Sequence, residues 1–267
     1  MSQTALNKPD ILLPPTQDEL PYDDGIPMET QRHKDQMEVL INALVPWLEQ
    51  REDGYIGGNM FVYFSIEQVR NQDYRGPDFF AVLGVPKGER KSWVVWQEGK
   101  APDVIIELLS PSTADRDKNE KKSIYQNQMR ASEYFWFDPF NPEDWEGFLL
   151  EGGVYQPIAI NEGGQRISRA LELALVRWQG SFRGVEATWL RWATLEGELL
   201  LLPEERAEAA ELRAENAELR AENADRARQE TIPRLLGMGL TLEQVAEALG
   251  LTVEEVRSSS KSDNNRA

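Results

Sequence analysis

Residues 103–109 read Asp-Val-Ile-Ile-Glu-Leu-Leu, and this stretch decides how the chain folds. Five of its seven side chains are apolar and three of them are β-branched, which favours a strand covered on both faces. Pro111 ends the run, and Ser112 and Asp115 have the spacing of a weak capping box for a helix that reaches about Met129. The sequence therefore predicts a buried strand followed closely by a helix.

Further elements are expected on both sides of this pair. Apolar residues at three- and four-residue steps predict an amphipathic helix from Thr30, its N-cap, to about Arg51, although Pro46 should kink or loosen the last turn. Shorter strands are expected between Trp145 and Trp192. Other strands are expected at 59–64, 78–83, 93–96 and 133–137. The order helix, strands, helix, strand predicts an α/β fold with helices against a mixed sheet.

The composition is that of an ordinary globular protein with a sizeable core. The chain has 267 residues, of which 40% are hydrophobic and eight are tryptophan. It holds no cysteine, which excludes disulfides, thiolate catalysis and cysteine-ligated zinc and is typical of a reducing compartment. No apolar run approaches the roughly 18–20 residues of a membrane-spanning helix, and the first ten residues lack the pattern of a secretory signal. We therefore expect a cytoplasmic protein with no membrane partner.

The net charge of −17 limits how the chain could meet a nucleic acid. Proteins that coat a phosphate backbone usually present a basic face, because much of their affinity comes from released counterions. An acidic total argues against tight, metal-free, sequence-independent binding, although a local basic groove or metal ions can still supply attraction. Part of the acidity lies in the C-terminal third, so we expect the main domain to be less acidic than the total.

Changes in composition divide the chain into five parts. Residues 1–29 are rich in proline and acid and are expected to form an extended arm, and residues 30–200 form the main domain. Residues 201–231 are expected to form a coiled-coil helix, residues 232–257 a small helix–turn–helix-like unit, and residues 258–267 a disordered tail.

Residues 204–230 carry a seven-residue repeat that is typical of a coiled coil. With Leu212 and Leu219 at position d, Asn216 and Asn223 fall at position a, and opposite charges fall at e and g. This arrangement specifies parallel dimers, so we expect a homodimer through residues 204–230. The alternative is a solvated single helix, because short isolated helices are only marginally stable.

The two helices expected within 232–257 resemble a DNA-reading pair in outline only. A recognition helix usually offers Arg, Asn or Gln to base edges, whereas the second helix here begins Val-Glu-Glu-Val at residue 253. Acidic side chains oppose phosphate binding. A packing role, or the docking of a protein partner, is therefore favoured over DNA reading.

Two acids stand where a metal-dependent hydrolase needs them. Hydrolysis of a phosphodiester needs an activated water and relief of the developing charge, and divalent ions held by carboxylates supply both. Asp78 follows Pro77 at the start of one expected strand, and Glu107 lies 29 residues on in the most apolar strand. A carboxylate buried there is costly unless it binds a cation or accepts hydrogen bonds. The alternative reading of Glu107 is a structural ion pair with a helix lysine.

The helix expected after this strand carries the lysine side chains that could serve this chemistry. Lys121 stands one turn before Tyr125 on the face expected to point inward, so its ammonium can reach back to the sheet. Lys118 and Lys122 are expected to face solvent or to contact phosphate. Asp103 shares a strand face with the glutamate four residues later, which makes it a supporting or alternative ligand.

Other polar and aromatic features have plainer readings. His33, the single histidine, stands among polar helix residues and is expected to be exposed and away from the site. Tyr125 is expected in the core or directly behind the ligands. The aromatic runs 61–64 and 135–137 are expected to fill the core and not to stack on bases.

Three segments resemble a known family, and the resemblance covers about residues 30–190. RGPDFFAVL from residue 75, APDVIIELLSPSTADRDKNEKKSIY from 101 and SEYFWFDP from 132 are similar to the Uma-type restriction endonucleases, a branch of the PD-(D/E)XK nuclease superfamily. The family pattern runs PD, E-V-x-S-P-S-T, a spaced D and K, Y, and E-Y-W. This chain matches the pattern at Pro77-Asp78, Glu107, Ser110–Thr113, Asp117, Lys121, Tyr125 and Glu133-Tyr134. Phe135 is a departure that should affect packing only.

The resemblance implies a restriction-endonuclease-like core that binds Mg²⁺ or Mn²⁺ through Asp78 and Glu107. It also implies that Lys121 replaces the lysine usually found two residues after the glutamate, where Leu109 stands. DNA is the implied substrate. The residues expected to support these groups from behind are Asp103, Asp117, Tyr125 and Lys118.

Three functional hypotheses remain open from the sequence. The first is a homodimeric, metal-dependent endonuclease. The second is an interaction protein that keeps the nuclease fold as a scaffold and recruits a protein partner through its coiled coil and C-terminal helices, which the acidic total favours. The third, a regulator whose tail binds operator DNA, is disfavoured because that tail is acidic.

Overall fold

The computed structural model describes residues 14–22, 28, 30–71 and 75–263, which fall into two compact units, Met1–Pro203 and Glu204–Ala267. Most of the predicted N-terminal arm and residues 264–267 of the predicted tail lie outside the described residues. The described part of the arm packs on the first unit. Leu20 is buried, Tyr63 donates a hydrogen bond to the Pro21 carbonyl at 2.7 Å, and Trp96 donates to the Pro15 carbonyl at 2.8 Å.

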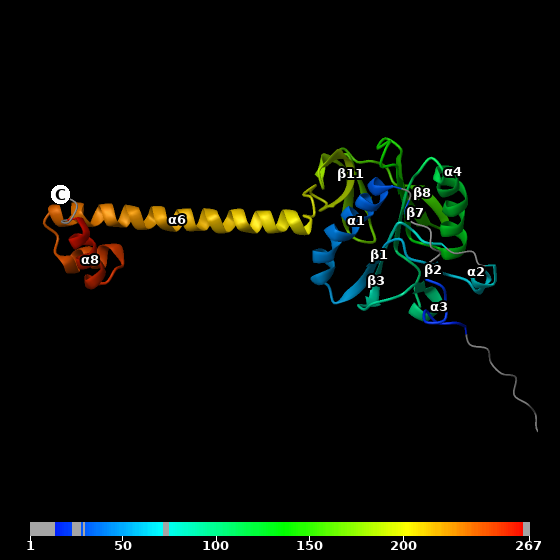
Figure 1. Cartoon of the computed structure of the whole chain (residues 1–267), viewed down its shortest axis with the longest axis horizontal. Helices are drawn as coiled ribbons and strands as arrows, with labels where there is room; N and C mark the ends of the chain where they lie inside the picture. The colour runs from blue at the N-terminus through cyan, green and yellow to red at the C-terminus, as the bar shows by residue number, and fades with distance from the viewer. Residues whose placement is uncertain (1–13, 23–27, 29, 72–74, 264–267) are drawn as a thin grey trace, which may run out of the picture. The chain divides into compact units, whose positions relative to one another are not determined.

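A six-stranded mixed sheet forms the centre of the first unit (Figure 1), in the order β1–β3–β5–β6–β7–β8. Its strands are β1 Asp53–Gly57, β3 Phe79–Pro86, β5 Val104–Leu108, β6 Glu133–Phe137, β7 Trp145–Glu151 and β8 Val154–Pro157. Only β5 and β6 pair in parallel within this sheet. The predicted mixed sheet flanked by helices is therefore confirmed.

Two smaller sheets complete the first unit. One is antiparallel and consists of β9 Gln165–Ser168, β10 Leu173–Phe182 and β11 Val185–Ala193, in the order β11–β10–β9. The other pairs β2 Val62–Tyr63 with β4 Trp93–Val94 in parallel. The predicted strands between Trp145 and Trp192 are present, but the expectation that they are short is wrong for β10 and β11, which have 10 and 9 residues.

Helices cover the two faces of the main sheet. Helix α1, Gln31–Glu49, packs with β10 and β11 against the face that carries Phe79 and Ile106. The opposite face carries Phe80 and Ile105 and is covered by a continuous helical segment. This segment consists of α4 Ala114–Arg116, the π-helical η1 Asp117–Lys121, α5 Lys122–Ile124 and the π-helical η2 Tyr125–Met129. Strand β5 is buried along its whole length, as its apolar sequence predicts.

Several local predictions need correction. Strand β1 was not predicted, because its five residues include an aspartate and two glycines and it becomes a strand by pairing with β3. The expected strand 59–64 shrinks to β2, since Asn59 takes a left-handed conformation with φ of 48°. Trp96 lies in the one-turn helix α3, Val95–Glu98, which ends at the left-handed Gly99. The short helix α2 spans Ile66–Asn71.

The ends of the predicted helices agree only in part with the structure. Thr30 caps α1 as expected and accepts a hydrogen bond from the backbone N–H of His33, and the helix continues past Pro46. The capping box at Ser112 is wrong, because the Ser112 hydroxyl bonds the Ser110 hydroxyl and α4 begins after Thr113 with no side-chain cap.

The second unit contains three helices, α6 Pro203–Gly237, α7 Leu242–Leu249 and α8 Val253–Asp263. Thr241 and Gln244 form a capping box for α7, and Thr252 and Glu255 exchange the same pair of bonds before α8. A small core lies where the end of α6 meets α7 and α8, centred on Ile232, Val245, Ala246 and Val256. The predicted helix pair is present, but α8 continues to residue 263, where a disordered tail was expected from 258.

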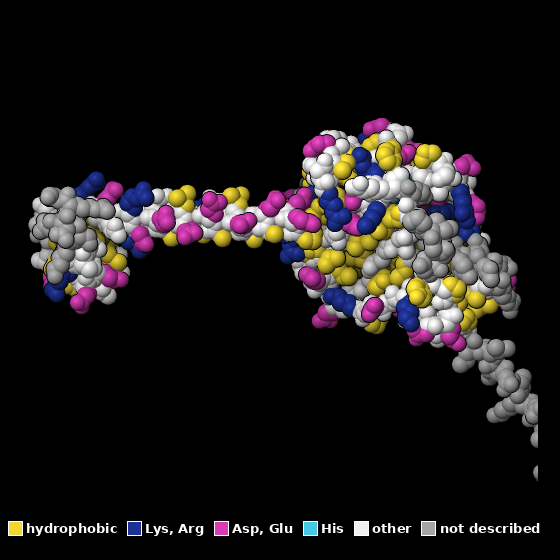
Figure 2. All heavy atoms as spheres, viewed as in Figure 1, with side chains coloured by type: hydrophobic (Ala, Val, Ile, Leu, Met, Phe, Trp, Pro, Cys, Tyr) yellow, Lys and Arg dark blue, Asp and Glu magenta, His cyan; other side chains and the backbone are white. Residues whose placement is uncertain are grey.

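Helix α6 is longer than the predicted coiled-coil segment and is exposed along residues 206–230 apart from the half-buried Ala209. Figure 2 shows acidic and hydrophobic side chains side by side along it. Leu212 and Leu219, the predicted d positions, are 60% and 53% exposed. The side-chain amide of Asn216 donates to the Leu212 carbonyl at 2.8 Å. The predicted a and d positions of the coiled coil are therefore exposed to solvent in the single chain.

Candidate active site

Asp78 and Glu107 meet because β3 and β5 are adjacent antiparallel strands. Phe79 pairs with Ile106, so one step further along the same register Asp78 stands opposite Glu107. Side chains alternate along a strand, which places both acids on the face that also carries Phe80. The Asp78 carboxylate accepts a hydrogen bond from the backbone N–H of Leu108 at 2.7 Å, which fixes it beside the glutamate.

Glu107 is 1% exposed and both of its oxygens have donors. The Tyr125 hydroxyl donates to Oε1 at 2.6 Å, and the Lys121 ammonium lies 3.0 Å from Oε2. The same ammonium lies 2.7 Å from Oδ1 of Asp117, which is also buried. The structure thus brings Lys121 and Tyr125 to the strand glutamate, as the sequence predicts, and places Asp117 on the far side of the lysine.

The turn after β5 directs the helix back over these acids. Ser110 accepts backbone hydrogen bonds from Thr113 and Ala114, and its buried hydroxyl bonds the hydroxyls of Ser112 and Thr113. The Ser-Pro-Ser-Thr segment is therefore a compact hydroxyl-bonded turn. It reverses the chain so that the helical segment crosses the face from which Glu107 projects.

The helical segment presents three site residues at four-residue steps, Asp117, Lys121 and Tyr125. Its π-helical turns help to keep these side chains on one face. An α-helix turns about 100° per residue, so each four-residue step drifts about 40° around its axis. The wider turns of η1 and η2 hold more residues each and reduce this drift. The Tyr134 hydroxyl donates to the Asp117 carbonyl at 2.9 Å, which fastens the first π turn to β6.

The electrostatics of the cluster favour a protonated lysine among carboxylates. Burial lowers the pKa of the Lys121 ammonium, but the carboxylates of Glu107 and Asp117 more than offset this effect, and the pKa is raised overall. Burial raises the pKa of the Glu107 carboxyl, although Lys121 and the hydrogen bond from Tyr125 lower it. Burial raises the pKa of the Tyr125 hydroxyl well above its ordinary range, so this hydroxyl stays a donor.

The donor set is compatible with a hard divalent cation. Two carboxylates, those of Asp78 and Glu107, stand across adjacent strands, and Asp117 adds a third negative charge against the single ammonium of Lys121. Among the described residues, no three His, Asp or Glu side chains form a ready-made metal cage. Two carboxylates suffice for Mg²⁺, because this ion keeps several waters and also accepts carbonyl ligands.

Two predicted supporting residues lie away from this cluster. Asp103 accepts a hydrogen bond from the backbone of Leu83 and pairs with Lys100 at 2.8 Å. It lies four residues before Glu107, or roughly 13 Å along a strand. Lys118 pairs with Asp144 and lies over the ring of Trp136.

His33 is buried, which corrects the expectation that it is exposed. Its Nε2 lies 3.0 Å from the carbonyl of Leu109, two residues after Glu107, and its Nδ1 lies 2.8 Å from the Thr30 hydroxyl. A carbonyl only accepts, so Nε2 carries the proton and Nδ1 accepts from the hydroxyl. His33 therefore anchors the start of α1 to the end of β5. No local signal pointed to this contact, because its partner is 76 residues away.

Glu133 is a further buried acid whose role the motif alone did not show. Its carboxylate accepts hydrogen bonds from the Ser168 hydroxyl and from the backbone N–H groups of Arg169 and Ala170. It therefore ties the start of β6 to the turn between β9 and β10. All three donors belong to one turn, which is a structural role and not a catalytic one.

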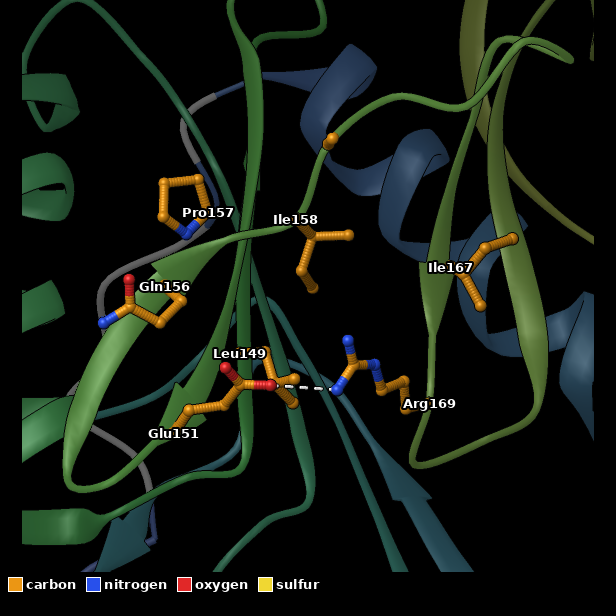
Figure 3. A pocket seen from close by; sticks show the side chains of 8 residues that line it. Leu149, Glu151, Gln156, Pro157, Ile158, Ile167 and Arg169 are labelled. Atoms are coloured by element: carbon orange, nitrogen blue, oxygen red, sulfur yellow. Dashed lines mark hydrogen bonds and ion pairs between the residues drawn. The ribbon is translucent and has the colours of Figure 1, made fainter.

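A groove of about 470 Å³ lies between the edge of the main sheet and β9 (Figure 3). Leu149, Gln156 and Ile167 line it, and an ion pair of 2.9 Å between Glu151 and Arg169 crosses it. The groove is not lined by any of the four charged site residues, Asp78, Glu107, Asp117 and Lys121. The groove is therefore a separate feature of the surface.

The mixed sheet, its covering helices and the acids on adjacent strands define a restriction-endonuclease-like α/β protein. The chain belongs to the family described as "Uma2: Putative restriction endonuclease", which matches residues 12–180. The resemblance drawn from the three sequence segments is thereby confirmed.

The solved structures that are similar to this chain include that of "a putative nuclease belonging to DUF820 from Anabaena variabilis ATCC 29413". The identity is 17%, the TM-score is 0.38, and the match covers 55% of this chain and 88% of that one. No curated protein matches. Among the described residues, no helix is both long and apolar enough to cross a bilayer.

Proposed function

We propose that this protein is an endonuclease that hydrolyses DNA phosphodiester bonds with Mg²⁺ or Mn²⁺. The observation that carries the proposal is the position of Asp78 opposite Glu107, with the Lys121 ammonium 3.0 Å from the glutamate. Membership of the Uma2 family supports the same reaction class. A bare structural ion pair would need only Glu107 and a lysine, whereas here a second carboxylate stands beside them.

Each residue of the cluster has a distinct role in this proposal. Asp78 and Glu107 hold the cation, together with a main-chain carbonyl near Leu108. When bound, the cation supplies charge relief to the phosphoryl oxygens and an acidic water. Lys121 keeps its proton, because its pKa is raised, so it orients the attacking water or stabilises negative charge and does not act as a general base. Tyr125 holds Glu107 in place through its hydroxyl.

Attraction to DNA must be local, because the first unit is itself acidic. It carries 32 acidic and 20 basic residues, a net charge of −12, which is less acidic than the total of −17, as expected, but is still strongly acidic. Residues 114–130 differ, with five basic and three acidic side chains. We infer that this helical segment and the bound cation supply the attraction for phosphate. Cleavage should therefore weaken steeply as salt is raised.

Cleavage of supercoiled plasmid DNA with Mg²⁺ or Mn²⁺ tests the proposal. The variants Asp78→Ala, Glu107→Ala and Lys121→Ala should each lose on the order of 100-fold or more of the activity. Asp115→Asn, which removes an exposed acid at the start of the same helix, is the matched control and should cleave at least as fast as the native protein, because the segment becomes more basic. Full activity of Glu107→Ala would refute the assignment.

We also propose that two copies associate in parallel through residues 204–230. Leu212 and Leu219 are exposed in the single chain, and the charges at g and e are complementary between parallel copies. Sedimentation should give a dimer, and Leu212→Glu with Leu219→Glu should give a monomer. A native monomer at micromolar concentrations would contradict the proposal.

A second function is supported by the charge and by the long exposed helix. In it, the fold is a scaffold without activity, and α6 to α8 recruit a protein partner. The net charge of the first unit and the exposure of α6 favour this alternative. Calorimetry with Mn²⁺ separates the two functions. No heat of binding, together with no cleavage of duplex or single-stranded DNA, would support the scaffold and exclude the endonuclease.

A further inference from the structure

The Lys121 ammonium stands between two buried carboxylates that belong to different elements. It lies 3.0 Å from Glu107 on β5 and 2.7 Å from Asp117 on η1. Both acids are 1% exposed, whereas the lysine is 16% exposed. In the proposed function Glu107 is a cation ligand, so a bound cation and the ammonium compete for the same carboxylate.

The competition follows from the geometry of Glu107. Its Oε1 is held by the Tyr125 hydroxyl and its Oε2 by the Lys121 ammonium, so a cation that binds Oε2 must take the place of that ammonium. A divalent cation on Oε2 would lie within a few ångströms of the ammonium. Two cations at that separation in a buried site repel each other strongly. One of them must move away.

Asp117 provides a place for the lysine to go. Asp117 and Lys121 lie four residues apart on one helical segment, so their ion pair does not depend on the position of the sheet. Tyr134 fixes the backbone at Asp117 to β6. The lysine can therefore give up Glu107 without losing a charged partner and without entering solvent.

We propose that Lys121 exchanges partners when the site binds a divalent cation, leaving Glu107 and staying on Asp117, which makes Asp117 the positioning residue for this ammonium. In the metal-free protein the ammonium offsets the charge of Glu107, and with the cation present it is kept beside the reacting phosphate by Asp117. This inference rests on the proposed function, because it takes Glu107 as a cation ligand.

The inference predicts opposite effects of two substitutions on cation affinity. Lys121→Met removes the competitor, so Mn²⁺ should bind about tenfold more tightly. Asp117→Asn removes the alternative partner and commits the lysine to Glu107, so Mn²⁺ should bind about tenfold more weakly. In a Lys121→Met background there is no lysine to hold, so Asp117→Asn should change the affinity less than about threefold.

Isothermal titration of the full chain with MnCl₂ and no nucleic acid measures all four affinities of this cycle. Lys118→Met and Asp115→Asn are matched controls, because they remove the same charges from the same helical segment without touching Glu107. Both should stay within about twofold of the native affinity. The rise in melting temperature caused by Mn²⁺ provides a second reading, and it should be larger in Lys121→Met than in the native protein.

Several outcomes would overturn the inference. Unchanged Mn²⁺ affinity in Lys121→Met would mean that the lysine and the cation do not compete. An equally large effect of Asp117→Asn in both backgrounds would make Asp117 a direct ligand. If Lys121→Met does not fold, the Mn²⁺ affinity of Asp117→Asn still tests the inference. An affinity equal to that of the native protein would show that Asp117 does not position the lysine.

The outcomes also separate this inference from the proposed function. Absence of Mn²⁺ binding by the native protein would overturn both. If the native protein binds Mn²⁺ and cleaves DNA, but the effects of Lys121→Met and Asp117→Asn on Mn²⁺ affinity are independent of each other, only the partner exchange is overturned. The expected cycle without cleavage of any DNA would support the partner exchange and refute the endonuclease.

Discussion

Replacing Tyr125 by phenylalanine removes one hydroxyl from the centre of the site and nothing else. This hydroxyl donates to Oε1 of Glu107 at 2.6 Å, and both side chains are buried. Hydrogen bonds to a charged partner contribute roughly 1.5–3 kcal/mol to stability, and water cannot readily replace this one. Phenylalanine keeps the ring packed against Tyr134, so little cavity is left. We therefore expect Tyr125→Phe to lower the free energy of unfolding by about 2 kcal/mol.

Urea denaturation followed by tryptophan fluorescence measures this change. All eight tryptophans lie in the first unit, so the signal reports only the unit that contains Tyr125. Tyr155→Phe is a matched control, because that hydroxyl is also buried but donates to the neutral carbonyl of Ala131 at 2.9 Å. The control should cost only about 0.5–1.5 kcal/mol. Equal costs in the two variants, or a cost below about 0.5 kcal/mol for Tyr125→Phe, would refute a charged acceptor at Glu107.

Two further perturbations test other parts of the structure. Burial raises the pKa of Glu133, so the folded state binds this proton more tightly than the unfolded chain, and the stabilisation present at low pH is lost as the pH rises from 4.5 through the raised pKa. The free energy of unfolding lost in Glu133→Gln should therefore be smaller at pH 8 than at pH 5. A loss that grows with pH in urea titrations would be evidence against this. A Cβ at Gly58 would lie 2.6 Å from the Asp78 carbonyl oxygen, so Gly58→Ala should cost about 1–3 kcal/mol. At Gly76 the nearest atom would be 3.5 Å away, and equal costs at the two glycines would contradict this packing.

The fold was largely predictable where one element carries its own signal. The apolar run of β5 and the three- and four-residue periodicity of α1 predict those elements and their burial. Strand β1 was not predictable, because an aspartate and two glycines leave little strand signal in its five residues and its pairing with β3 makes it a strand. The same holds for the packing of Leu20 from the arm, which depends on residues far away in the sequence.

The site was predictable to the extent that spacing and burial cost could show it. A carboxylate in an apolar strand predicts a partner, and the four-residue step from Lys121 to Tyr125 predicts that both point inward. That Asp78 stands opposite Glu107 depends on the register of β3 and β5, which the sequence does not reveal. A shared strand face does not bring two side chains into contact, because Asp103 shares its face with Glu107 yet pairs with Lys100 and the Leu83 backbone.

Anomalous diffraction from a crystal of the full chain soaked in Mn²⁺ measures most directly whether Asp78 and Glu107 hold one cation. We predict a single peak within about 2.0–2.4 Å of carboxylate oxygens of both residues, with the Lys121 ammonium on Asp117. A Mn²⁺ peak bound elsewhere would contradict that prediction. So would a protein that cleaves DNA but shows no peak beside Glu107 and still has the Lys121 ammonium paired with that glutamate.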